Sequence, residues 1–134
     1  MAARGAVTLV ILLDTSFIID SLCGGRRSAP ALFRALDRGE KLGLCTVALY
    51  EWLRGPRLAD EIATQEALFP SAAAVPFETV DARLAAELYR SLKRARTREA
   101  DIAIAACAIR REAELWTLNP EDFADIPGLR LVRG

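Results

Sequence analysis

The stretch VTLVILLDTSFIID, Val7 to Asp20, joins an uncharged, almost wholly aliphatic run to one carboxylate and two hydroxyl side chains. Residues 7–13 are typical of a parallel strand that is covered on both faces. A helix is predicted from 16 to 22, where Cys-Gly-Gly ends it. Ligand sites in parallel sheets form beyond the carboxyl ends of the strands, so Asp14 is expected at such an edge.

The rest of the chain alternates predicted helices and strands. The predicted helices span 28–39, 46–56, 57–69, 81–95 (with Asp81 as its cap) and 99–112, and a short one spans 119–123. The predicted strands span 41–46, 72–78, 114–118 and 127–132. This alternation favours an α/β fold, a three-layer sandwich with a central, mostly parallel sheet. The 134 residues contain no long linker, which predicts a single domain over residues 1–134.

Composition excludes several classes of chemistry. The 18 basic and 18 acidic residues give a net charge of zero, so no global field attracts nucleic acid. Histidine is absent, which removes the commonest general base and every Ser-His or Cys-His mechanism. The three cysteines show no zinc or disulfide spacing, and the first apolar run is too short to span a bilayer. We therefore expect a cytoplasmic protein.

Three acidic residues interrupt apolar stretches, and each has an ordinary explanation. Asp14 follows the first strand, where capping of the next helix is as good an explanation as function. Glu51 interrupts TVALYEWL, and a surface ion pair with Arg54 is the simpler interpretation for that residue alone. Asp101 opens DIAIAACAI, a helix predicted to be buried nearly all round. Contact with the helix dipole would explain it, but Glu99 could supply that contact from a more exposed position.

A fourth acidic position lies in TLNPEDF. Asn119 is expected to cap a short helix, with Pro120 in its first position and two acids that favour the helix dipole. This explanation is nearly complete for the motif, and Asp122 stays a candidate for a fourth site acid.

If Asp14, Glu51 and Asp101 converge at one sheet edge, their charges need compensation. Two carboxylates about 4 Å apart repel by roughly 4 kcal/mol at an effective dielectric constant of about 20. Arg54 and Arg98 could offset part of this; otherwise the acids keep protons at a raised pKa or hold a cation. Oxygen ligands without His or Cys select a hard ion, Mg²⁺ or Mn²⁺. Such an ion activates water for in-line displacement at a phosphate, as nucleases require.

Four segments, LLDTSFIID, YEWLRG, ADIAIAACA and LWTLNPEDFADIPGLRLV, resemble the PIN domain in order and spacing, and more narrowly the VapC-type toxins of toxin–antitoxin modules. The resemblance covers essentially the whole chain, and T-x-N-x-x-D-F followed by PGL is its most specific part. It implies a PIN-like fold and a Mg²⁺-dependent endoribonuclease, often a homodimer, that a cognate antitoxin silences. Two departures leave substrate fit open: no glycine stands shortly before Asp101, and Trp52 replaces a smaller aliphatic residue.

The resemblance also implies the site residues. Asp14, Glu51 and Asp101 are its acids, Asp122 or Asn119 takes the fourth position, and Thr15 or Ser16 supports the metal or its waters. Asp14 and Asp101 are expected to hold the ion, while Glu51 orients the attacking water. Five arginines are candidate contacts to RNA phosphates, although a solvated surface is the simpler interpretation of each: Arg26, Arg27, Arg94, Arg96 and Arg98.

The expected partners are an RNA substrate, an antitoxin and a second copy of the chain, in a homodimer or a toxin–antitoxin hetero-oligomer; no membrane is expected. One alternative is a PIN-like binding module without catalysis. A receiver-type signalling domain would need an Asp ending a middle strand and a Lys ending a later one, which the sequence lacks. A phosphohydrolase with a D-x-D nucleophile is disfavoured because Ser16 stands at the second acid's position.

Overall fold

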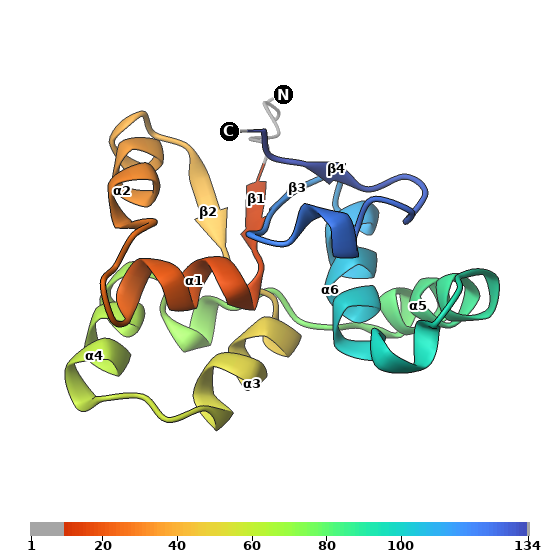
Figure 1. Ribbon diagram of the computed structural model, residues 1–134, viewed down its shortest axis with the longest axis horizontal. Coiled ribbons are helices and arrows are strands. Elements are labelled where there is room, and N and C mark those ends of the chain that lie inside the picture. Colours follow the sequence, from red (N-terminus) through yellow and green to blue (C-terminus); the bar gives the residue numbers. More distant parts are fainter. Residues whose placement is uncertain (1–9, 134) are drawn as a thin grey trace.

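The computed structural model describes residues 10–133 and has a four-stranded sheet at its centre, in the order β2-β1-β3-β4 (Figure 1). All three strand pairings are parallel, which confirms the predicted fold class. The strands are β1 (Val10–Leu13), β2 (Lys41–Gly43), β3 (Glu114–Trp116) and β4 (Arg130–Leu131). Residues 7–9 of the first predicted strand lie outside the described part of the chain.

Six α-helices surround this sheet within residues 10–133. They are α1 (Thr15–Leu22), α2 (Ala29–Asp37), α3 (Thr46–Arg54), α4 (Ala59–Leu68), α5 (Thr79–Ser91) and α6 (Glu99–Arg110). Three short 3-10 turns join them to the remaining elements: η1 (Ser71–Ala73), η2 (Ala95–Thr97) and η3 (Pro120–Asp122). None of the helices in these residues has the length and apolar character needed to cross a membrane.

Side chains of β1 alternate between two hydrophobic layers, as expected for a strand buried on both faces. Ile11 and Leu13 pack with α1, α2 and α4, whereas Leu12 packs with α5 and α6. Figure 1 shows these two groups of helices on opposite sides of the sheet. Helix α3 contributes to both layers, through Ala48 on one side and Trp52 on the other. It therefore lies across the end of the sheet.

The strand predicted over residues 72–78 is wrong. The segment begins with the 3-10 turn η1 and makes one isolated parallel bridge, between Val75 and Cys45. Two backbone hydrogen bonds of 2.8 Å hold this bridge, one to Val75 O and one from Val75 N. Pro76 follows at once, and because proline has no amide hydrogen it cannot extend a ladder on that side.

Asp81 is not the cap of α5, which begins two residues earlier with Glu78 at the N-cap. The Asp81 side chain is fully buried and accepts a 2.7 Å hydrogen bond from the Glu78 amide and a 2.9 Å bond from Arg111 Nη1. Arg110 Nε also donates to it. Burial alone would raise the pKa of Asp81, but these donors outweigh it and lower the pKa to about 2. The cluster fixes α5 against α6.

Candidate active site

The carboxyl ends of β1 and β3 form the point at which the chain connections diverge. From β1 the chain leads through α1 and α2 to β2 on one side, while β3 lies on the other side. Leu13 and Trp116 are register partners, so the residues that follow them, Asp14 and Thr117, stand at equivalent positions. Crevices at such switch points are where open parallel sheets bind their ligands.

Asp14 is buried, with 4% of its surface exposed, and its carboxylate is held by two hydroxyls. Ser16 Oγ and Thr117 Oγ1 each donate a 2.8 Å hydrogen bond to the same oxygen, Oδ2. Backbone amides donate to these hydroxyls in turn, from Leu118 to Ser16 at 3.1 Å and from Asn119 to Thr117 at 3.0 Å. Each hydroxyl accepts from an amide and directs its own hydrogen to the carboxylate. Asp14 is therefore held in one orientation.

Glu51 reaches the same place from α3. Its Oε1 accepts a 2.7 Å hydrogen bond from Thr15 Oγ1, at the start of α1. Its Oε2 lies 3.6 Å from Arg54 Nη2, the ion pair that the helical spacing predicted. The Arg54 side chain is 57% exposed and that of Glu51 is 17% exposed, so solvent screens the pair and the arginine compensates the acid only in part.

Asp101 is the third residue of α6 and faces the other two acids. One cleft of about 480 Å³ is lined by Asp14, Glu51 and Asp101, together with Thr15, Ser16 and Asn119. The pKa of Asp101 is raised from 3.8 to about 6, first by burial and then by the charges of Asp14, Glu51 and Asp122, with Arg98 opposing weakly. A raised pKa of this kind is expected when carboxylates gather without enough compensating positive charge.

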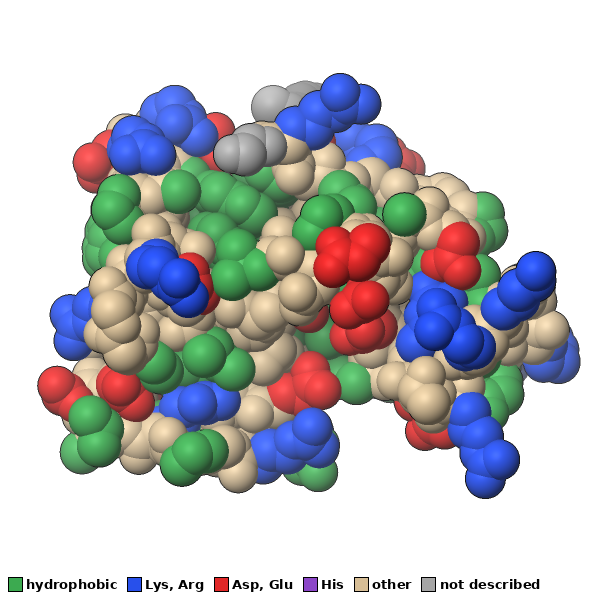
Figure 2. Space-filling view, viewed as in Figure 1, with side chains coloured by type: hydrophobic (Ala, Val, Ile, Leu, Met, Phe, Trp, Pro, Cys, Tyr) green, Lys and Arg blue, Asp and Glu red, His purple; other side chains and the backbone are tan. Residues whose placement is uncertain are grey.

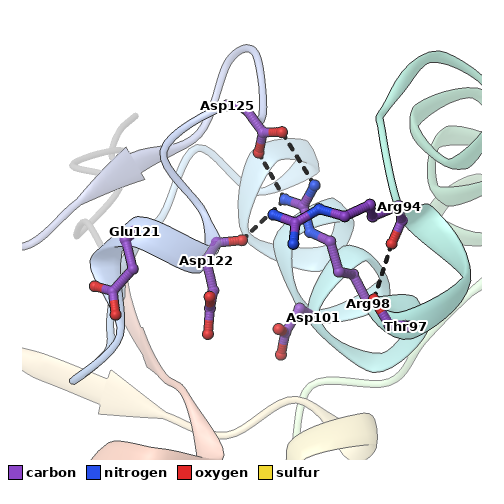
Figure 3. A pocket seen from close by; sticks show the side chains of 7 residues that line it. All are labelled: Arg94, Thr97, Arg98, Asp101, Glu121, Asp122 and Asp125. Atoms are coloured by element: carbon purple, nitrogen blue, oxygen red, sulfur yellow. Dashed lines mark hydrogen bonds and ion pairs between the residues drawn. The ribbon is translucent and has the colours of Figure 1, made fainter.

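Asp101 is shared with an adjoining cavity of about 180 Å³. Figure 3 shows the Asp101 and Asp122 carboxylates pointing into the same open space, from α6 and η3. Acidic side chains gather on the surface over η3, and basic side chains lie beside them over the segment that leads into α6 (Figure 2). The acidic surface thus continues from the cleft to Asp122.

The donor set fits a hard divalent cation because it consists of carboxylate, hydroxyl and amide oxygens. Within residues 10–133 no three acidic or sulfur side chains stand close enough to enclose an ion directly. Mg²⁺ does not need such a cage, because it usually keeps several waters and binds through one or two carboxylates.

Comparisons with known proteins identify the fold. The sequence profile described as the PIN domain matches residues 11–129. This chain belongs to the PIN domain family. Over 123 residues it is 35% identical to Ribonuclease VapC19 of Mycobacterium tuberculosis H37Rv, and the match covers 89% of this chain and 96% of that protein.

Solved structures share the PIN fold over nearly the whole chain. DNA-bound VapBC from Salmonella typhimurium aligns with a TM-score of 0.74 and 23% identity, over 93% of this chain and 98% of that one. A toxin–antitoxin complex from Klebsiella pneumoniae aligns with a TM-score of 0.64 and 27% identity, over 89% and 94%.

Of the five arginines predicted to bind phosphate, this PIN domain brings two to the acidic surface. Arg94 and Arg98 line the cavity that Asp101 and Asp122 share. Arg98 is bound within the protein: its side chain is 12% exposed, and its guanidinium donates to both oxygens of Asp125 and to the carbonyl of Asp122 (Figure 3). The other three line neither cavity: Arg26, Arg27 and Arg96. Arg26 and Arg27 come after the C-terminal end of α1, and that helix end lies about 12 Å along the helix axis from Asp14.

Two residues that the sequence does not single out contribute to the site: Thr117 contacts a cleft carboxylate, and Arg57 lines the cleft. Thr117 orients Asp14, and the signal for it was present in the motif T-x-N, one position after a predicted buried strand residue. Arg57 lines the cleft from the loop between α3 and α4, and its position depends on tertiary contacts that no spacing reveals.

Proposed function

We propose that this chain is a Mg²⁺-dependent endoribonuclease that hydrolyses RNA phosphodiester bonds and acts as the toxin of a toxin–antitoxin pair. Its 134 residues would form a single PIN-like ribonuclease domain. The proposal is supported by the 35% identity to a protein named a ribonuclease, over nearly its whole length. A structural relative that is 27% identical is named a toxin–antitoxin complex.

The observation that carries the proposal is the convergence of Asp14, Glu51 and Asp101 on one cleft. These residues come from the end of β1, from α3 and from α6, and the charges of the first two raise the pKa of Asp101. Such a cluster opposes folding unless its charge is neutralised. A divalent cation would neutralise the carboxylates and could bind a substrate phosphate at the same time.

The acids divide between metal binding and orientation of water in this proposal. Asp14, fixed by Ser16 and Thr117, and Asp101 would hold Mg²⁺ or Mn²⁺. Glu51, fixed by Thr15, accepts a proton from the attacking water and orients that water. When bound, the ion supplies charge neutralisation at the scissile phosphate and lowers the pKa of a water ligand. Asp122 or Asn119 would serve the fourth position by hydrogen-bonding water or substrate.

The proposed partners follow from the same relatives. We expect a cognate antitoxin that covers the acidic cleft, a homodimer or toxin–antitoxin hetero-oligomer, and a cytoplasmic location. An arginine of the antitoxin would fit among the acids, since a guanidinium binds carboxylates bidentately. It would exclude metal and RNA together.

Cleavage of RNA by the purified chain tests the proposal. The wild type should cut single-stranded RNA in Mg²⁺ and stop when the ion is chelated, whereas Asp14→Asn should be inactive with an unchanged circular dichroism spectrum. Glu121→Gln is the matched control, since this exposed carboxylate lines the adjoining cavity but not the acidic cleft, and it should remain active. A wild type that binds RNA without cutting it would favour the binding module instead.

A further inference from the structure

Arg57 lies in the loop between α3 and α4, and its side chain lines the same cleft as Asp14, Glu51 and Asp101. Its placement depends on contacts with neighbouring residues in the sequence. These include Trp52, which stands where the family resemblance leads one to expect a smaller aliphatic side chain.

The guanidinium of Arg57 is held against Trp52 by two contacts. Arg57 Nε donates a 2.8 Å hydrogen bond to the Trp52 carbonyl, and the guanidinium carbon lies 4.5 Å from the centroid of the indole ring. Trp52 is itself fully buried, and its Nε1 donates a 3.1 Å bond to Gln65 Oε1. Stacking on a fixed indole removes much of the freedom of a long side chain before any ligand binds.

Gly55 leaves the space that this guanidinium occupies. A Cβ added at Gly55 would lie 2.6 Å from Arg57 Nη2 and 2.9 Å from Arg57 Cζ. The backbone of Gly55, with φ −83°, is open to any residue, so conformation alone does not require glycine here. The small residue and the arginine therefore fit each other.

Arg57 also differs in its charge pairing from Arg54 and Arg98, two other arginines near the acids. Arg54 pairs with Glu51, and Arg98 pairs with Asp125. Within residues 10–133, Arg57 forms no ion pair with a carboxylate. The Cys23 thiol lies near both Arg57 and the Glu61 carboxylate, and Glu61 Oε1 accepts a 2.8 Å hydrogen bond from the Leu58 amide.

We propose that Arg57 binds an RNA phosphate that flanks the scissile one, and so sets the path of the strand across the cleft. This inference rests on the proposed ribonuclease function. A planar guanidinium matches two phosphate oxygens, and holding it in advance lowers the entropic cost of binding. RNA is favoured over a protein carboxylate as the ligand because the same cleft presents the acids proposed to act on its phosphodiester. Arg57 would therefore bind the substrate away from the reacting atoms.

Equilibrium binding of a short, fluorescein-labelled single-stranded RNA tests the proposal. All variants carry Asp14→Asn so that the probe is not cut, and anisotropy is measured over a series of salt concentrations. Arg57→Gln should raise the dissociation constant about tenfold, the loss expected for one charge-assisted hydrogen-bonding group. It should also reduce the slope of log K against log salt by about 0.7, the value for one lost phosphate contact on a single strand. Arg57→Lys keeps the charge and should retain the slope.

The matched control is Arg83→Gln, which removes an exposed α5 arginine that lines neither acidic cavity. It should leave the dissociation constant and the slope unchanged. Gly55→Ala should weaken binding by displacing the guanidinium. Adding Gly55→Ala to Arg57→Gln should then have little further effect, because both changes remove the same contact. Melting temperatures of all variants separate this result from unfolding.

Outcomes for the ribonuclease and for Arg57 can be told apart. Failure of the chain with Asp14 intact to cut RNA would remove the proposed function and this inference with it. If the wild type cuts RNA but Arg57→Gln binds RNA as tightly as Arg83→Gln does, the inference about Arg57 is overturned and the proposed function stands. Unchanged RNA binding by Arg57→Gln together with weaker binding of an antitoxin would also overturn it, and would assign the guanidinium to a protein carboxylate.

Discussion

Thr117 Oγ1 donates a 2.8 Å hydrogen bond to Asp14 Oδ2, and this contact joins the ends of two neighbouring strands that are far apart in the sequence. Ser16 donates to the same oxygen. Both hydroxyls use Oδ2, and no side chain within residues 10–133 donates to the second oxygen, Oδ1, so Oδ1 can accept a ligand. The orientation of a proposed metal ligand thus depends on a strand-end hydroxyl.

Removal of this hydroxyl should weaken metal binding without unfolding the protein. Thr117→Val keeps the shape of the side chain and deletes the donor, and we expect metal affinity to fall about 10- to 100-fold, as for other residues that orient metal ligands. Thr117→Ser keeps a hydroxyl and should remain near the wild type. Isothermal titration with Mn²⁺ measures the change. Equal affinities for Thr117→Val and the wild type would show that Asp14 does not need this support.

The raised pKa of Asp101 gives a specific pH dependence. Its pKa is about 6 in the folded protein, against an ordinary value of 3.8, because of burial and the nearby acids. Between these pH values the folded state binds a proton that the unfolded state has released. The contribution of Asp101 to the free energy of unfolding is therefore greatest below pH 3.8 and declines as pH rises through 6. Without a divalent ion, Asp101→Asn should therefore be more stable than the wild type above pH 6, and this difference should disappear below pH 3.8.

Thermal melting over a pH series in a chelator measures this difference. Adding Mg²⁺ above pH 6 should stabilise the wild type but not Asp101→Asn, since an ion that binds the native state shifts unfolding. A wild type more stable than the variant at every pH in chelator would contradict the proposed repulsion.

Asp81 should give the opposite pH dependence of stability, because its pKa is lowered to about 2. Its stabilisation is present above its ordinary pKa of 3.8 and is lost as pH falls toward 2. Asp81→Asn leaves Arg110 and Arg111 with only part of their pairing and should destabilise the fold by about 3–5 kcal/mol at neutral pH, the cost of breaking a buried ion pair. Urea unfolding of this variant and of Glu87→Gln, an exposed acid on the same helix, provides the comparison. Similar losses in both would refute the role of Asp81.

Local pattern predicts most of the fold and the meeting of the three acids in one cleft, while their chemical role stays a prediction. Within the described residues, the apolar run before Asp14 forms a strand over 10–13 and the apolar segment around Asp101 forms a helix over 99–110, as their patterns predict. Parallel topology then follows, since strands alternating with helices place the carboxyl ends of the strands at one edge. For Glu51 the sequence leaves both a surface ion pair with Arg54 and a place in the cleft open, and the structure contains both.

Features that depend on tertiary contacts cannot be predicted from local sequence patterns. The segment 72–78 has β-forming residues, but Pro76 limits it to one bridge. The sequence around Arg98 is typical of an exposed basic segment, yet Arg98 forms an ion pair with Asp125, which is distant in the sequence. The Arg57 side chain is positioned by its contact with Trp52 and by the space at Gly55, and neither relationship produces a recognisable sequence pattern.

The central claim is that Asp14 and Asp101 together hold one kind of ligand, a hard divalent ion. Electron paramagnetic resonance tests it directly, because Mn²⁺ loses its free-ion signal on binding to protein. We predict a saturable loss of signal with the wild type that excess Mg²⁺ reverses, no such loss with Asp14→Asn or Asp101→Asn, and full retention of binding by Glu121→Gln. Binding by both aspartate variants equal to that of the wild type, or no binding by the wild type above pH 6, would contradict the account.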